Sequence, residues 1–154
     1  MTGVQTCALP IFTLTTLAAL VPDDVPAELE LIDEGIADVP LDLEADLIGL
    51  TVITGTARRA YELADHFRAR GIAVVLGGPH VTLIPEDAAP HADAVVVGYA
   101  EDSWPQLLRD FAAGKLAKEY RQAPGLDIGG RPFPRRELLP SKHFLTNKDR
   151  KSVV

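Results

Sequence analysis

The strongest constraint on the fold is the alternation of short apolar segments with amphipathic ones. Nearly all-apolar runs cover residues 47–52, 72–76 and 94–97, and a weaker candidate strand covers 30–32. Strands that are apolar throughout suit a sheet covered on both faces. Strands that alternate with helices indicate parallel βαβ units. The sequence therefore predicts an α/β fold, a Rossmann-like or flavodoxin-like doubly wound parallel sheet.

Apolar residues between these runs recur at helical spacing. One such stripe consists of Ala60, Leu63, Ala64 and Phe67, and it predicts a helix that ends at Gly71. The same spacing from Trp104 to Phe111 predicts a second helix, with Asp102 or Ser103 as its cap and Trp104 in the core. A weaker apolar stripe with the same spacing over residues 14–21 predicts a first helix.

The first strand of the predicted sheet is hard to find. A flavodoxin-type sheet has about five strands, and its first strand lies in the middle. That strand should fall in residues 1–12, where Gln5, Thr6 and Pro10 interrupt the apolar pattern. Residues 1–11 and 149–154 also resemble translated sequencing-adapter sequence. We therefore expect residues 1–12 to be a non-native or disordered leader and the first central strand to be missing or replaced.

Charge and cysteine content exclude several functions. The chain has 15 Lys and Arg against 22 Asp and Glu, a net charge of -7, which is the wrong sign for binding nucleic acid. Its single cysteine, Cys7, cannot form an internal disulfide, a four-thiolate zinc site or a three-cysteine iron–sulfur site. No apolar run has the length of a membrane helix. We expect a cytoplasmic protein without nucleic-acid or membrane partners.

Three loops at the predicted carboxyl ends of the strands are candidates for ligand binding, because ligands of open parallel sheets bind there. Their candidate residues are Thr54, Gly55, Thr56 and Ala57, then Gly77, Gly78, Pro79, His80, Val81 and Thr82, and finally Gly98, Tyr99 and Glu101. Glycines let the backbone approach a ligand closely, and threonines supply hydroxyls. Each glycine could equally serve the fold alone, and His80 could cap a helix that starts near Glu86.

The loops alone do not name a ligand. The dinucleotide pattern GxGxxG and the P-loop lysine are both absent. The segments 47–55, 59–64, 74–82 and 92–98, in this order, resemble the N-terminal cobalamin-binding domain of cobalamin-dependent radical S-adenosylmethionine enzymes. The resemblance spans about residues 14–139. Within it, Tyr99 stands where the family usually has an acidic residue.

The resemblance implies a cobalamin-binding domain over residues 13–120, followed by a linker over 121–154. The linker would lead to a radical S-adenosylmethionine domain that this chain lacks, and many members of that family are methyltransferases. The iron–sulfur cluster and S-adenosylmethionine would bind only in the missing domain, so the chain alone would not catalyse. The three loops would line the cavity for the nucleotide tail and the corrin edge.

The resemblance also implies how cobalamin would be bound. The DxHxxG motif, which supplies an axial histidine in other cobalamin proteins, is absent, so a base-off cobalamin without a protein histidine ligand is expected. Gly78 should lie where the backbone comes closest to the cofactor, and valine there should weaken binding while leaving most of the stability. The alternatives are a stand-alone corrinoid-binding or sensing module and a doubly wound domain that binds another nucleotide.

Overall fold

The computed structural model describes residues 2–7, 11–125, 127 and 129–138. In these residues six parallel strands form one sheet, in the order β2-β1-β3-β4-β5-β6. The strands are β1 (Thr2–Cys7), β2 (Ala27–Ile32), β3 (Leu47–Thr51), β4 (Ala73–Gly77), β5 (Ala94–Val97) and β6 (Glu119–Arg121). The chain moves outward from β1 to β2 and then returns to β3 on the other side of β1. This reversal creates the switch point at which doubly wound sheets bind ligands.

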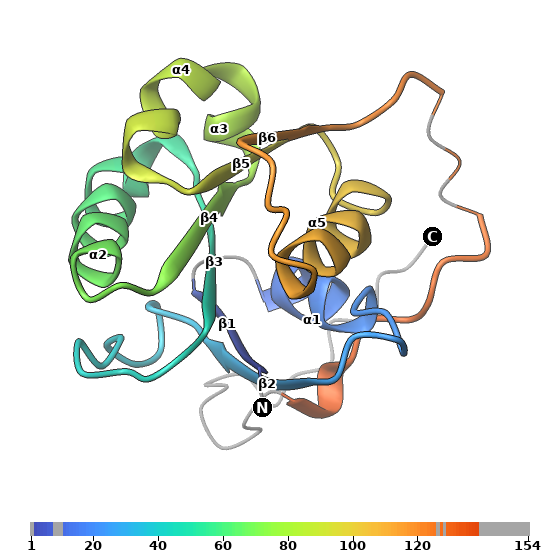
Figure 1. Cartoon of the computed structure of the whole chain (residues 1–154), viewed down its shortest axis with the longest axis horizontal. Coiled ribbons are helices and arrows are strands. Elements are labelled where there is room, and N and C mark those ends of the chain that lie inside the picture. Colours follow the sequence, from blue (N-terminus) through green and yellow to red (C-terminus); the bar gives the residue numbers. More distant parts are fainter. Residues whose placement is uncertain (1, 8–10, 126, 128, 139–154) are drawn as a thin grey trace, which may run out of the picture.

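Helices cover both faces of the sheet (Figure 1). On one face lie α1 (Ile11–Ala19) and α5 (Ser103–Ala112), and on the other lie α2 (Ala57–Ala69), α3 (Pro79–Leu83) and α4 (Pro85–Ala88). Each face has its own apolar core, one around Phe67 of α2 and one around Trp104 of α5. The predicted doubly wound α/β fold is confirmed, because apolar runs buried on both faces of the sheet require helices on both sides.

The first central strand, expected to be missing or replaced, is not missing, because its place is filled by residues 2–7. They form β1, which pairs with β2 along its whole length and with β3 from Val4 to Cys7. The backbone groups along the inner edges of β2 and β3 need hydrogen-bonding partners, and any extended segment of the right length supplies them. The sequence prediction judged side-chain pattern, whereas this pairing depends on the main chain. The adapter origin of these residues remains a prediction.

The sequence prediction missed β6, whose residues fall at the border of the predicted linker. Tyr120 is buried there, and its hydroxyl donates a hydrogen bond to Asp110 at 2.9 Å. After β6 the chain returns to the first helix, where the Arg135 N–H donates to the carbonyl of Thr15 at 3.0 Å. A short 3-10 turn, η3 (Arg136–Leu138), follows against α1. Within the described residues, no helix is both long and apolar enough to cross a membrane.

Candidate functional site

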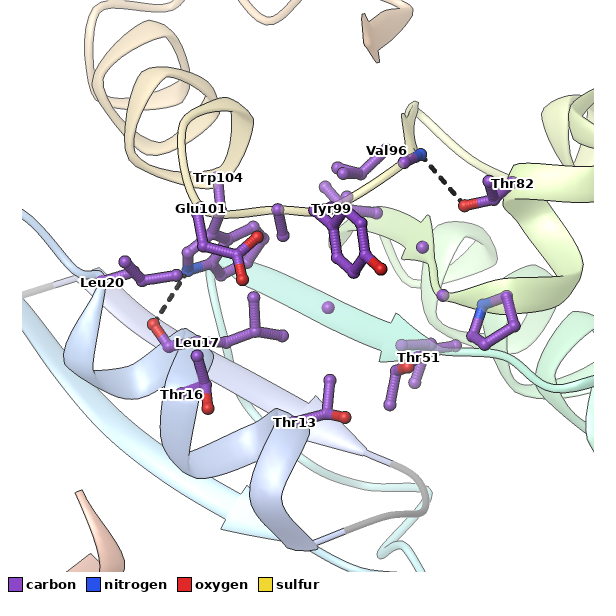
Figure 2. Close-up of a pocket in the computed structure, with 18 of the residues that line it drawn as sticks. Thr13, Thr16, Leu17, Leu20, Thr51, Thr82, Val96, Tyr99, Glu101 and Trp104 are labelled. Carbon is purple, nitrogen blue, oxygen red and sulfur yellow. Dashed lines mark hydrogen bonds between the residues drawn. The ribbon is translucent and has the colours of Figure 1, made fainter. Parts of the chain in front are cut away.

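A cavity of about 650 Å³ lies between the sheet and helices α1 and α5 (Figure 2). Its floor is formed by side chains that alternate along three neighbouring strands, as residues on one face of a sheet must. The pairs are Gly49 and Thr51 of β3, Val75 and Gly77 of β4, and Val96 with the following Gly98. Three of these six residues are glycines, which have no side chain, so space remains between the sheet and the helices.

The walls of the cavity come from the two helices and from the loop before α5. Helix α1 contributes Thr13, Thr16, Leu17 and the following Leu20. The opposite wall consists of residues 99–101 and Trp104. Most of this lining is apolar, with threonine hydroxyls and one carboxylate as the exceptions. The cavity is within the roughly 300–1,000 Å³ typical of small-ligand sites.

The structure brings about half of the predicted site residues to this cavity. The seven that line it are Gly77, Gly78, Pro79, Thr82, Gly98, Tyr99 and Glu101. The six that do not are Thr54, Gly55, Thr56, Ala57, His80 and Val81. The loop after β3 enters α2 on the other face of the sheet, and α3 packs on that face too, so Ala57 of α2 and Val81 of α3 are buried in its core. A binding role for these six stays a prediction.

Sequence reasoning missed the lining from α1 and from the strands. The prediction chose only residues that follow each strand. It overlooked residues within the strands that face the same side of the sheet, such as Gly49, Val75 and Val96. The two-residue period of a strand could have identified them. The contribution of α1 was overlooked because the strand before it was expected to be missing or replaced.

Gly78 is required by the fold itself. Its φ is +100° and its ψ is -177°, a region that is essentially restricted to glycine. A Cβ at this position would lie 2.8 Å from Thr51 Oγ1, 2.8 Å from Val52 N and 2.9 Å from Val52 O. The expectation that valine at Gly78 would leave most of the stability is therefore wrong. Loss of binding in such a variant would not reveal a contact with a ligand.

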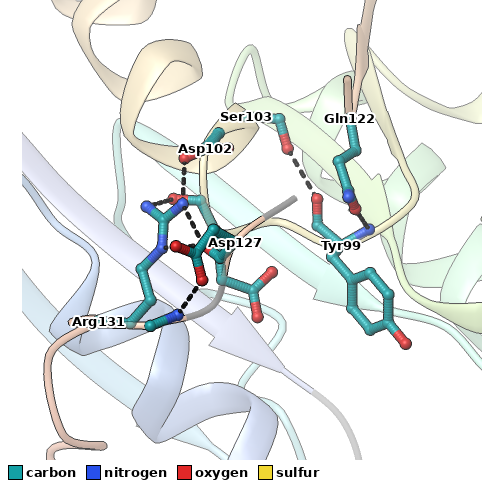
Figure 3. Close-up of polar contacts among 8 residues, drawn as sticks. Tyr99, Asp102, Ser103, Gln122, Asp127 and Arg131 are labelled. Atoms are coloured by element: carbon teal, nitrogen blue, oxygen red, sulfur yellow. Dashed lines mark hydrogen bonds and ion pairs between the residues drawn. The ribbon is translucent and has the colours of Figure 1, made fainter. Parts of the chain in front are cut away.

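The loop that closes the cavity is held by hydrogen bonds from the chain around it (Figure 3). The Gly98 N–H donates to Thr82 Oγ1 at 3.0 Å, and the Tyr99 N–H donates to Gln122 Oε1 at 2.7 Å. The Ser103 hydroxyl donates to the Tyr99 carbonyl at 3.3 Å. These contacts fix the main chain of the loop, while the Tyr99 side chain remains 69% exposed beside the cavity.

Arg131 attaches the segment after β6 to the same loop (Figure 3). Its guanidinium donates to Asp102 Oδ1 at 2.6 Å, to the Asp127 carbonyl at 3.1 Å and to the Glu101 carbonyl at 3.4 Å. Asp102 stands at the N-cap position of α5, as predicted, but its side chain makes no capping hydrogen bond. Its carboxylate pairs with Arg131 instead.

His80 belongs to a cluster on the other face of the sheet. Its Nδ1 lies 3.2 Å from Thr54 Oγ1, and its buried Nε2 lies 3.5 Å from Asp87 Oδ2 without the geometry of a hydrogen bond. The Tyr61 hydroxyl donates to the same Asp87 oxygen at 3.2 Å. Burial, followed by this contact with Asp87, raises the pKa of Tyr61 to about 12. His80 lies within α3 and caps neither helix there, so the capping alternative is wrong.

Trp104 is buried, as the helical stripe predicted, yet one part of it also lines the cavity. Its indole Nε1–H donates to the Leu17 carbonyl at 3.2 Å and so joins α5 to α1 across the cavity (Figure 2). Among the residues that the structure describes, no group of three or more His, Cys, Asp or Glu side chains is placed to hold a metal ion.

Comparison with known proteins agrees with this geometry. Over residues 17–108, more than half of the chain, the sequence matches the family described as the B12 binding domain. The chain belongs to this family. The matched residues include the end of α1 from Leu17 onward, the strands β2 to β5 and the loop that closes the cavity. The predicted resemblance to a cobalamin-binding domain is thus confirmed.

The relatives of this B12-binding domain include methyltransferases. The chain is 45% identical over 114 residues to the bacteriochlorophyllide d C-8(2)-methyltransferase of Chlorobaculum tepidum, which covers 72% of this chain and 25% of that protein. It is 30% identical over 121 residues to the C-12(1)-methyltransferase of the same organism, which covers 77% of this chain and 25% of that protein. The chain thus spans about a quarter of the length of these relatives. No solved structure matches it.

The cavity fits part of a corrinoid. Cobalamin consists of a large macrocycle and a nucleotide tail, and about 650 Å³ accommodates a ligand the size of the tail rather than the whole molecule. The apolar walls suit a planar base, and the threonine hydroxyls suit the polar sugar and phosphate. One oxygen of Glu101, Oε2, is buried and has no hydrogen-bond partner in the described part of the chain. The lining therefore offers a place for a donor from a ligand.

Proposed function

We propose that this B12-binding domain holds cobalamin with its nucleotide tail in the cavity between α1 and α5. The corrin would then rest at the carboxyl edge of the sheet, over the glycine-rich ends of β4 and β5. The observation that carries this proposal is the position of the cavity. It lies at the carboxyl ends of parallel strands beside the switch point, within the residues that match the family. When bound, cobalamin supplies a cobalt centre that can carry a methyl group.

We further propose that the corrin is presented to a radical S-adenosylmethionine domain elsewhere in the parent protein. That domain would hold the iron–sulfur cluster and S-adenosylmethionine. Two observations support this part. The two relatives described above are methyltransferases, and the chain covers only a quarter of their length. The segment after β6 also returns to the cavity loop through Arg131, which would couple a following domain to the cofactor site.

The cobalt would lack a protein histidine ligand. In the described residues, none of His66, His80 and His91 lines the cavity. The His80 ring is buried toward Thr54 and Asp87. Bound cobalamin should therefore show the absorption spectrum of a base-off form, and His80→Ala should leave that spectrum unchanged.

Titration of the chain with cobalamin, followed by absorption spectroscopy, tests the site. The decisive variant is Gly77→Val, because Gly77 lies on the cavity floor and a Cβ there would meet only Val96, at 3.4 Å and beyond. Its branched side chain would enter the cavity and should weaken binding at least tenfold, about 1.4 kcal/mol. Thermal melts establish that the variant is folded.

The comparison variant is Gly55→Val, in the loop after β3. A Cβ at Gly55 would meet nothing within 4 Å, and the residue lies outside the cavity. Binding should be unchanged. If Gly55→Val weakened binding and Gly77→Val did not, the loop of Thr54 to Ala57 would be the binding site and the cavity proposal would fail. In an intact gene, a three-cysteine motif after residue 144 would support the radical domain, and its absence would favour a stand-alone corrinoid-binding module.

A further inference from the structure

One buried carboxylate oxygen in the cavity is left without a hydrogen bond. Glu101 Oε2 is shielded from solvent and has no donor among the residues that the structure describes. Figure 2 shows the Glu101 carboxyl beside Trp104, on the side of the cavity where Leu17 and Leu20 lie. Unsatisfied buried polar atoms are rare because each one loses its hydration without compensation. A donor supplied by a ligand would resolve this.

Three donors near Glu101 already have other partners. The Trp104 indole N–H donates to the Leu17 carbonyl, and the Tyr99 N–H donates to Gln122. The nearby guanidinium of Arg131 contacts the main-chain carbonyl of Glu101 and the carboxylate of Asp102. Arg131 therefore holds the backbone of the loop in place through these contacts, and Glu101 lines the cavity.

The surroundings indicate which part of a ligand would reach this oxygen. Threonine hydroxyls from Thr51 and Thr82 lie at one end of the cavity, at the carboxyl edge of the strands (Figure 2). Glu101 lies away from these two hydroxyls, beside Trp104 and on the side of Leu17 and Leu20, where Thr16 is the one further hydroxyl that Figure 2 labels. A sugar and phosphate suit the end with the hydroxyls, and a flat ring with one polar edge suits the apolar end. The occupant of the apolar end would thus be a heterocyclic base.

We infer that Glu101 selects the tail base of the corrinoid by accepting a hydrogen bond from an N–H group on that base. The domain would prefer corrinoids whose base carries such a donor, as the exocyclic amine of adenine does. The neutral dimethylbenzimidazole of cobalamin carries none, because one ring nitrogen bears the ribose and the other is only an acceptor. This inference rests on the proposed function, since it assumes that the tail occupies the cavity.

The test compares two corrinoids, cobalamin and its analogue with an adenine base, by absorption titration of the whole chain. The parent chain should bind the adenine form at least tenfold more tightly. In Glu101→Met, which keeps the length of the side chain and removes its charge, the two affinities should become equal through weaker binding of the adenine form. Glu86→Met, the same substitution at an exposed glutamate of α4 on the other face of the sheet and outside the cavity, is the matched control and should keep the preference.

Thermal melting without corrinoid provides a second readout. Because Glu101→Met removes an unpaired buried oxygen, it should not lower the melting temperature, whereas a purely structural role of the carboxylate would lower it. Equal affinity of the parent for both corrinoids, or a preference that survives Glu101→Met, would overturn the inference and leave cobalamin binding intact. If the parent bound neither corrinoid, the proposed function itself would be wrong.

Discussion

Replacement of Gly78 by alanine should destabilise the domain even in the absence of any ligand. The φ of +100° and ψ of -177° lie in a region whose occupation by another residue costs about 1–3 kcal/mol. The new Cβ would also stand 2.8 Å from Val52 N and 2.9 Å from Val52 O. Those two atoms are fixed by backbone hydrogen bonds to the Gly77 carbonyl and from the His80 N–H. Relief of such crowding costs about a further 1–3 kcal/mol.

The expected loss of unfolding free energy is thus about 2–6 kcal/mol, a large part of the roughly 5–15 kcal/mol that stabilises a domain. At about 2–4 °C per kcal/mol for a chain of this size, the melting temperature should fall by about 4 °C or more. Circular dichroism melts of the ligand-free chain measure this fall. Gly55→Ala is the control, because its Cβ would meet nothing within 4 Å, and it should change stability by less than about 0.5 kcal/mol. Equal melting temperatures for the two variants would refute the reasoning.

Two further predictions concern the two faces of the sheet. Trp104→Phe removes the indole N–H that donates to the Leu17 carbonyl and should lower the free energy of unfolding, measured in urea, by about 0.5–1.5 kcal/mol. The loss stays modest because the same carbonyl also accepts the Leu20 N–H. An unchanged urea midpoint would contradict the role of this bond. On the other face, the pKa of Tyr61 is raised by burial from 10.0 to about 12, so its contribution to stability is full below pH 10 and is lost as the pH rises from 10 toward 12. The free energy of unfolding should therefore fall less steeply over this range in Tyr61→Phe than in the parent, and identical slopes would show that Tyr61 does not titrate as described.

The sequence predicted the parts of the fold that depend on local pattern. The apolar runs became β3, β4 and β5, and the helical stripes became α2 and α5, because burial on both faces of a sheet leaves no polar positions in its strands. The ordered segments around Gly55, Gly78 and Gly98 also indicated the B12-binding family, which the comparison confirms. Gly78 was singled out correctly as a special position: its backbone conformation requires glycine, and the expected contact with a ligand stays a prediction.

Tertiary structure alone decided which face of the sheet bears the cavity. Thr54 and His80 follow the strands just as Thr82 and Glu101 do, yet they lie outside the cavity. The loop after β3 carries Thr54 toward α2 on the other face, and the His80 ring packs beside Thr54 and Asp87 there. The place of β1 was likewise decided by two neighbouring strands that required main-chain partners, whatever the side chains of residues 2–7. For β3 to β5 and for α2 and α5, local sequence determined whether the segment forms a strand or a helix. The side of the sheet to which each helix packs, and hence the site, follows from the order of the strands and from contacts between residues far apart in the chain.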